Sequence, residues 1–272
     1  MYRDDDLVRF ETFGPLPLPL AGEQGHITTM GAGIWYASMG QGPAVVLLHG
    51  GMGNATNWGY QVPALVGAGY RVIVIDSRGQ GRSSRDARPY SYALMADDTL
   101  AVLDVLGVER ASFVGWSDGA CTSLVLADHR PERCAGVFFF ACNMDASGIK
   151  PFVYTDTIGR CLSRHKQDFA ALSPTPDAFD ATFEALGAMQ RSQPDYSSAD
   201  LARISVPVWS VLGEHEEFIT LDHATYLARA IPGASLHILA GVSHFAPVQR
   251  PELFNQVMLE FLSAVSPIAG PG

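Results

Sequence analysis

The stretch "GWSDG" (Gly115 to Gly119) has the residue types and spacing of a G-x-S-x-G nucleophile elbow. It follows the apolar run "ASFV" and opens a helical pattern, so it lies at a predicted strand-to-helix turn. A serine on such a turn adopts a strained backbone conformation, and flanking glycines remove the side chains that would clash. Its hydroxyl then stands exposed at the carboxyl end of the sheet, beside the free N–H groups of a helix N-terminus. We therefore interpret Ser117 as a catalytic nucleophile rather than as an ordinary serine in a glycine-bounded turn.

A serine hydroxyl is a poor nucleophile unless a base accepts its proton. The sequence contains eight histidines, and His244 has the most favourable position. It lies in "GVSHFAPVQRPE", between the last predicted strand and the last predicted helix. Loops at that edge of a parallel sheet converge on the crevice that holds the elbow, so we predict that His244 is the general base. The other histidines that we considered lie too early in the chain, in the predicted insert or in regular elements: His49, His129, His165 and His237.

The stretch "LHGGMGN" (Leu48 to Asn54) could supply hydrogen-bond donors for the developing negative charge. Its glycines allow backbone N–H groups to approach a substrate oxygen closely. We predict an oxyanion hole formed by the amide of Asp118, the residue after the nucleophile, and that of Gly51 or, as an alternative, Met52. A phosphate-binding loop is disfavoured because no G-K-[ST] follows. The Asp118 carboxylate itself is explained by the dipole of the helix that it opens.

The composition is that of a globular protein with a large buried core. Of the 272 residues, 47% are hydrophobic and 17% are charged. The net charge of −10 argues against nucleic acid or an anionic membrane as a partner, because both are negatively charged. We expect a small-molecule substrate, a monomer or homodimer, and neither a cofactor nor a metal.

Cysteine usage and the N-terminal sequence indicate the compartment. The four cysteines show no CxxC spacing and lie mostly in apolar surroundings, so we expect them to be reduced and buried. The opening "MYRDDDLVRF" is acidic and is not a secretory signal. No apolar run is long enough to span a bilayer. We therefore expect a cytoplasmic protein.

From Gly25 onward, apolar runs of strand length alternate with helical patterns. The first two runs are joined by "GAG" and predict a hairpin, and the later runs are continuous, as in strands buried on both faces. Such alternation predicts an α/β fold with a mostly parallel sheet covered on both faces. The predicted strands span residues 26–30, 33–38, 44–50, 71–76, 111–116, 134–141, 206–213 and 235–241. The predicted core helices span about 58–68, 92–107, 118–130, 222–231 and 251–265.

Two segments depart from this alternation. Residues 1–24 form the predicted N-terminal arm. The proline-rich stretch "FGPLPLPLAGEQG" (Phe13 to Gly25) predicts an extended conformation that covers the body or serves a partner chain. Residues 144–204 interrupt the core, which comprises 25–143 and 205–272. This insert contains "AFDATFEALGAMQ", so we predict a helical cap rather than an independent domain. Four apolar residues of that stretch share one predicted helical face: Phe179, Phe183, Leu186 and Met189.

With these motifs in place, the chain resembles the α/β-hydrolase fold serine hydrolases over about residues 25–265. Four stretches occur in the expected order, namely "LHGGMG", "DSRGQGRS", "GWSDG" and "GVSHFAPVQRPE". The resemblance implies a central, mostly parallel sheet flanked by helices, a small helical cap inserted between two core strands, and Ser-His-acid machinery. In the family "DSRGQGRS" is chiefly a structural loop, so we assign Arg78 and Arg82 no catalytic role. The chain is similar to small capped esterases, enol-lactone hydrolases and carbon–carbon bond hydrolases.

The resemblance also indicates where the acid of the triad should be. It usually lies just after the strand that follows the cap, three residues past a glycine, and is usually aspartate. In "LGEHEEF" the glycine is Gly213, and this spacing identifies Glu216. Glutamate is accepted chemistry in this fold. Two alternatives stay open, namely Asp145 in "CNMDAS", after the preceding strand, and the neighbours Glu214 and Glu217, which we expect to be solvated.

The leading hypothesis is a serine hydrolase of a small apolar or aromatic carboxylic ester, acting through an acyl-enzyme. A second hypothesis gives the same triad to a lactone or a carbon–carbon bond. A third is a ligand-binding or receptor-like homologue without catalysis. Epoxide chemistry is set aside because those relatives use an aspartate nucleophile. Residues expected to contact the substrate are Met52, Trp116, Met144 and Phe179, and further apolar cap residues are Phe152, Tyr154 and Phe183.

Overall fold

A computed structural model describes residues 5–19 and 22–268 of the chain. Within these residues, eight strands form one sheet in the order β1-β2-β4-β3-β5-β6-β7-β8. The strands from β4 to β8 in this order are parallel, and β2 pairs antiparallel with both β1 and β4. The strands are β1 (Glu23–Thr29), β2 (Ala32–Met39), β3 (Ala44–Leu48), β4 (Arg71–Ile75), β5 (Ala111–Trp116), β6 (Cys134–Phe140), β7 (Val208–Gly213) and β8 (Ser235–Leu239).

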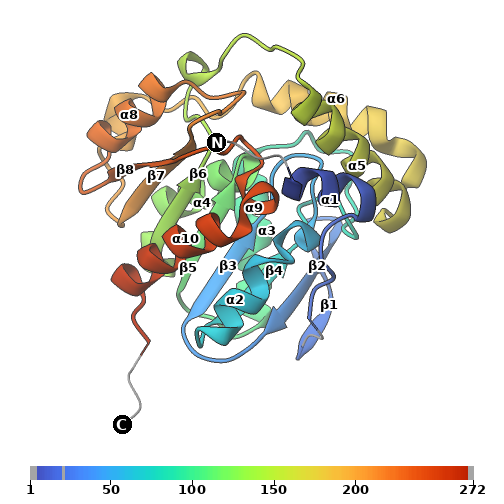
Figure 1. The fold of residues 1–272 in the computed structure, drawn as a ribbon. Coiled ribbons are helices and arrows are strands. Elements are labelled where there is room, and N and C mark those ends of the chain that lie inside the picture. The colour runs from blue at the N-terminus through green and yellow to red at the C-terminus, as the bar shows by residue number, and fades with distance from the viewer. Residues whose placement is uncertain (1–4, 20–21, 269–272) are drawn as a thin grey trace.

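Helices cover both faces of this sheet (Figure 1). In β3, Val46 and Leu48 belong to one hydrophobic cluster and Val45 and Leu47 to the other, because successive strand residues point to opposite faces. The first cluster includes side chains of α3 and α4, and the second includes side chains of α2 and α10. The helices are α1 (Asp5–Phe13), α2 (Gln61–Gly67), α3 (Tyr92–Val105), α4 (Asp118–His129), α5 (Asp156–Leu172), α6 (Phe179–Gln190), α7 (Ser198–Leu201), α8 (Leu221–Ala230), α9 (Ala246–Gln249) and α10 (Pro251–Val265).

The fold class predicted from the sequence is confirmed. The hairpin of β1 and β2 turns at Met30 and Gly31, both with positive φ. Helix α3 ends just before Gly107, whose φ of 63° suits a glycine beyond a helix C-terminus. Pro251 occupies the first turn of α10, where its missing N–H costs nothing. Each of these boundaries follows from local backbone chemistry.

The segment between β6 and β7 contains three helices: α5, α6 and α7. Helix α6 was predicted, but the longer α5 was not, because its apolar residues are separated by charged ones. Of the face predicted for α6, Phe179, Leu186 and Met189 are buried, whereas Phe183 is exposed. Phe183 stacks on Phe179, with ring centroids 6.3 Å apart.

The N-terminal arm contains a helix that the sequence did not predict. Helix α1 packs against α5 and α9 (Figure 1). Its Leu7 and Phe10 are fully or almost fully buried. The proline-rich residues that follow include Leu16, whose backbone lies against Gly59. The described part of the arm therefore covers the body. Residues 1–4 and 20–21 of the predicted arm, and 269–272 of the predicted core, lie outside the described residues.

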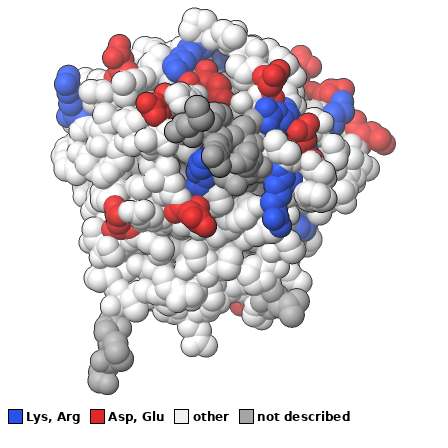
Figure 2. Space-filling model, viewed as in Figure 1, with Lys and Arg blue, Asp and Glu red and all other residues white. Residues whose placement is uncertain are grey.

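Charged side chains are mixed on the face shown in Figure 2, where red and blue groups gather in the upper half and the lower half is nearly white.

All four cysteines belong to the described residues, are buried and form no disulfide. Over the described residues, no helix combines the length and the apolar character needed to cross a membrane.

Candidate active site

Ser117 occupies the turn between β5 and α4 with φ 53° and ψ −122°. This backbone conformation is strained for any residue with a side chain, as expected for a nucleophile elbow. Close packing explains both flanking glycines. A Cβ on Gly115 would overlap the backbone of Ala120, and one on Gly119 would overlap the carbonyl of Leu48. The turn is fastened by a hydrogen bond from the Ser117 N–H to the Phe140 carbonyl at 2.9 Å.

His244 lies in the loop between β8 and α9, next to this elbow. Its ring centroid is 6.1 Å from that of Trp116, the residue before Ser117. The carboxylate of Asp118, the residue after Ser117, is close enough to raise the pKa of the imidazole. The structure thus brings together the predicted nucleophile segment and the predicted base.

A carboxylate from the loop after β7 binds the histidine ring. The Nδ1 atom of His244 lies 2.7 Å from Oε1 of Glu216, and both side chains are almost fully buried. Because an ionised carboxylate only accepts hydrogen bonds, Nδ1 carries the proton and Nε2 is left as a proton acceptor. Oε1 also accepts the backbone N–H of Phe218 at 3.0 Å, which fixes the direction of the Glu216 side chain.

The surroundings of His244 favour its charged form. Burial lowers its pKa, but the negative charges of Glu216, Glu217 and Asp118 outweigh burial, and the pKa lies above the ordinary value of 6.5. Three aromatic rings enclose the imidazole and limit screening by water, namely those of Trp116, Phe218 and Phe245. The Phe218 ring is the nearest, with an edge-on contact at 4.6 Å between centroids, and was not foreseen.

Glu214 is exposed, as expected, whereas Glu217 is half-buried, and each carboxylate binds the loop that carries His244. Oε2 of Glu214 accepts the N–H of Gly241 at 2.8 Å. Oε2 of Glu217 accepts the backbone N–H of His244 itself, also at 2.8 Å. Strands β7 and β8 are neighbours, so the loops after them run side by side. The carboxylates of the first loop therefore accept backbone N–H groups of the second that have no partner in a strand or helix.

Asp145, the alternative acid, pairs with a different histidine. Its Oδ2 atom lies 3.9 Å from Nδ1 of His223, and its Oδ1 atom caps the short helix that begins at Ala146 by accepting the N–H of Ser147. Nε2 of His223 accepts the N–H of Met144 at 3.0 Å. The Nε2 atom of that ring is therefore occupied in holding the segment after β6.

The two residues predicted to supply the oxyanion hole adjoin, and the alternative to Gly51 is disfavoured. A Cβ on Gly51 would lie 2.7 Å from Oδ2 of Asp118, so these two residues adjoin. The N–H of Met52 instead donates to Oε1 of Gln80 at 2.6 Å. Because that amide already has a buried partner, Gly51 is the better candidate of the two.

The Asp118 carboxylate joins the core to the cap, which the sequence did not reveal. It accepts the Tyr92 hydroxyl of α3 at 2.8 Å and the amide of Gln190, at the end of α6, at 3.0 Å and 3.1 Å. Burial raises its pKa, whereas the hydrogen bonds from Tyr92 and Gln190 and the nearby His244 lower it. No spacing rule links these three residues, since Gln190 is 72 positions away from Asp118.

The apolar residues expected to contact substrate have different surroundings. Trp116 lies against His244, and Met52 follows Gly51 at a positive φ of 62°. Met144 is fully buried, with its amide bound to His223. Phe179 packs between the cap helices against Phe169, with ring centroids 5.6 Å apart. Substrate contact by these residues stays a prediction. Phe152 and Tyr154 are largely exposed.

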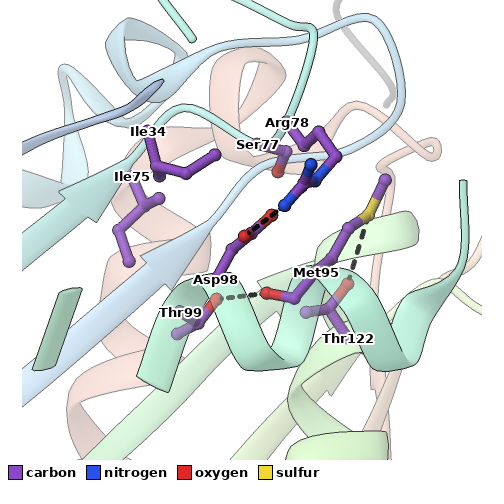
Figure 3. A pocket seen from close by; sticks show the side chains of 8 residues that line it. All are labelled: Ile34, Ile75, Ser77, Arg78, Met95, Asp98, Thr99 and Thr122. Carbon is purple, nitrogen blue, oxygen red and sulfur yellow. Dashed lines mark hydrogen bonds and ion pairs between the residues drawn. The ribbon is translucent and has the colours of Figure 1, made fainter. Parts of the chain in front are cut away.

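The arginines of "DSRGQGRS" are held by carboxylates. Arg78 is buried and its Nη2 lies 2.6 Å from Oδ1 of Asp98, at a small cavity beneath the loop (Figure 3). Nη1 of Arg82 lies 2.9 Å from Oδ2 of Asp76, whose other oxygen accepts the N–H of Ala55 at 2.6 Å. The Arg78–Asp98 pair ties the loop after β4 to α3, and the Asp76 carboxylate ties that loop to the segment after β3, as a structural role requires.

Comparison with known proteins bears on this arrangement. A family model described as alpha/beta hydrolase fold matches residues 43–157. A 2-hydroxy-6-oxononadienedioate/2-hydroxy-6-oxononatrienedioate hydrolase of Burkholderia vietnamiensis is 30% identical over 261 residues, which cover 84% of this chain and 90% of that protein. The chain belongs to the α/β-hydrolase fold family.

Two further relatives of this α/β-hydrolase differ in how much they cover. Epoxide hydrolase B of Mycobacterium tuberculosis is 48% identical over 99 residues, but the match spans 36% of this chain and only 28% of that protein. The structure titled "Est816 as an N-Acyl homoserine lactone degrading enzyme" has a TM-score of 0.70 and 28% identity. It covers 87% of this chain and 100% of its own.

Proposed function

We propose that this α/β-hydrolase is a serine hydrolase of carboxylic esters that works through a Ser117–His244–Glu216 triad. One observation carries the proposal. Ser117 has a left-handed φ at the end of β5, and the ring of the preceding Trp116 lies 6.1 Å, between centroids, from a histidine whose Nδ1 donates to a buried carboxylate. That arrangement gives the imidazole the tautomer of a base, with Nε2 free to take a proton. The aromatic rings around His244 favour a small apolar or aromatic ester.

In the proposed reaction, Nε2 of His244 takes the proton of the Ser117 hydroxyl while Oγ forms a bond to the ester carbonyl carbon. The carbonyl electron pair moves to the oxygen, and the amides of Gly51 and Asp118 donate to this oxyanion. The carbonyl re-forms as the bond to the leaving oxygen breaks, and the imidazolium protonates the departing alcohol. Water then attacks the acyl-enzyme with the same groups, and the carboxylic acid is released. Glu216 stabilises the imidazolium in both halves.

Replacement of the nucleophile tests this proposal directly. We expect S117A to lower kcat for a short p-nitrophenyl ester by at least about ten-thousandfold, because no other hydroxyl can form the acyl-enzyme. Ser147→Ala is a matched control, since Ser147 is an exposed serine whose hydroxyl binds Asp145 outside the triad. Turnover by S117A at the rate of S147A would overturn the proposal.

A second candidate keeps the triad and changes the bond to a lactone or a carbon–carbon bond. The similarity over most of the chain to a dienedioate hydrolase and to a protein described as degrading N-acyl homoserine lactones favours it. A panel of p-nitrophenyl esters, N-acyl homoserine lactones and vinylogous ring-fission diketones separates the options by kcat/KM. Higher kcat/KM for a lactone or a diketone than for every ester would replace the ester assignment.

Epoxide hydrolysis stays set aside although one relative bears that name, because the elbow of this chain holds a serine. The alternative of a ligand-binding homologue without catalysis is tested by a fluorophosphonate. Covalent labelling of Ser117 requires an activated hydroxyl, so labelling that depends on His244 excludes a purely binding role.

A further inference from the structure

Glu217 binds the candidate catalytic histidine at a point that the triad does not use. Its Oε2 atom accepts the backbone N–H of His244 at 2.8 Å, while Glu216 binds the ring of the same residue. Two consecutive glutamates of one loop therefore hold one histidine by its main chain and by its side chain.

The backbone N–H of His244 needs this partner. Helix α9 begins only at Ala246, so the amide of His244 precedes it and has no acceptor within a helix. His244 is only 6% exposed, which keeps water from replacing a lost acceptor. Loss of the Glu217 carboxylate would leave a buried donor unpaired and let the loop move. A shift of that backbone moves the imidazole relative to Ser117, and proton transfer depends steeply on this distance.

The charge of Glu217 also acts on the ring. It is half-buried, and burial is the largest influence on its pKa and raises it, while the hydrogen bond from His244 lowers it. In a site walled by aromatic rings, a second carboxylate stabilises an imidazolium more than it would in water. The groups whose charges lie near His244 come from several elements: Glu216 and Glu217 after β7, Asp118 of α4, and His165 of α5. Lys150 donates to the Glu216 carbonyl at 2.6 Å.

We propose that Glu217 is a positioning residue for the hydrolysis, which anchors the main chain of His244 and supplies a second negative charge to the imidazolium. This inference rests on the proposed function, because it assigns Glu217 a role in proton transfer by His244. Glutamine at this position would keep an oxygen acceptor and remove the charge, whereas alanine would remove both.

Glu214 provides a matched control. It belongs to the same loop and makes the same type of bond, from a carboxylate to a backbone N–H at 2.8 Å, but its partner is Gly241. The experiment compares E217Q, E217A and E214Q with the unchanged protein on a p-nitrophenyl ester. It measures kcat, KM, the pH profile of kcat/KM and the titration of the His244 ring by NMR, with H244Q to assign the resonance.

We expect E217A to lower kcat roughly tenfold with little change in KM, since a bond to a charged group is lost and substrate contacts are not. For E217Q we expect a smaller loss of kcat, with the acid limb of the profile and the NMR titration of His244 both shifted to lower pH. E214Q should match the unchanged protein in all four measurements. If E217A does not fold, E217Q decides the matter by its NMR titration.

The two proposals fail in different ways. Unchanged turnover by S117A would overturn the proposed function. An inactive S117A, together with E217Q and E217A that match E214Q in kcat and in the titration of His244, would overturn the role of Glu217 alone.

Discussion

Two acid–histidine pairs lie at neighbouring strand ends of this α/β-hydrolase, and they differ in almost every physical respect. After β7, Glu216 binds His244 at 2.7 Å, and both groups are buried among aromatic rings. After β6, Asp145 lies 3.9 Å from His223, and its carboxylate is partly exposed. Carboxylate and imidazole alone therefore do not make a catalytic pair, because distance and burial decide how strongly the charges interact.

The two histidines also differ at Nε2, the ring nitrogen that does not face the carboxylate. Nε2 of His223 already accepts the N–H of Met144, so that ring joins two chain segments. The His244 ring faces the elbow segment, with Trp116 and Asp118 on either side of Ser117 in sequence. A neutral histidine has one nitrogen that accepts a proton, and in His223 that nitrogen is already bonded within the fold.

The largest expected difference between the pairs is in turnover after loss of each ring. We expect H244Q to lower kcat for a p-nitrophenyl ester by about ten-thousandfold or more, because the serine then has no base. H223Q should keep kcat within about threefold and lower the melting temperature instead, since its bond to Met144 is structural. Initial rates and thermal unfolding check both variants. Equal losses of activity would remove the distinction between the pairs.

Replacement of the two acids, Glu216 and Asp145, should change kcat by amounts that differ nearly as much. E216Q is expected to reduce kcat by about a thousandfold to ten-thousandfold. The neutral amide of glutamine does not stabilise the imidazolium, and its NH₂ group can favour the tautomer that lacks a proton on Nδ1. For D145N we expect less than a threefold change, since its carboxylate does not touch the candidate base. The measurement is kcat on the same ester. Should D145N lose activity and E216Q retain it, the acid of the triad is Asp145.

The smallest expected effect is in stability, where the two pairs respond to pH with opposite signs. The pKa of His244 is raised in the folded state, so its pair stabilises fully below the ordinary value of 6.5 and loses this as pH rises through the folded pKa. Burial lowers the pKa of His223 in the folded state, and the charge of Asp145 offsets this only in part. Its contribution is present above 6.5 and is lost as pH falls through the folded pKa.

Urea unfolding of H244Q and H223Q at about pH 5.5 and about pH 8 tests these signs. The free energy of unfolding of each variant is subtracted from that of the unsubstituted protein at the same pH, which removes the contribution of titrating groups common to both. The stability lost in H244Q should be larger at the lower pH, and that lost in H223Q larger at the higher pH. The same sign for both would contradict the contrast.

The core was predictable because its signals are local. The strand runs, the glycines around Ser117 and Pro251 at the first turn of α10 each constrain a few consecutive residues. Helix α5 and helix α1 were missed because their apolar residues cover neighbours that are distant in sequence, and the helical pattern is broken by charges. Leu7 and Phe10 are buried in a helix that packs against α5 and α9, and no sequence motif indicates this packing.

By itself, the sequence determined the fold class and indicated the elbow at Ser117, the loop of His244 and the acidic loop "LGEHEEF", because short-range sterics and strand order dictate these. Only the tertiary structure distinguished the acids. It paired Glu216 with the His244 ring, Glu217 with its main chain, and Asp145 with His223. It also joined Asp118 to Gln190 of the cap. Which carboxylate meets which donor depends on ångström distances between strand ends, and no spacing along the chain contains that information.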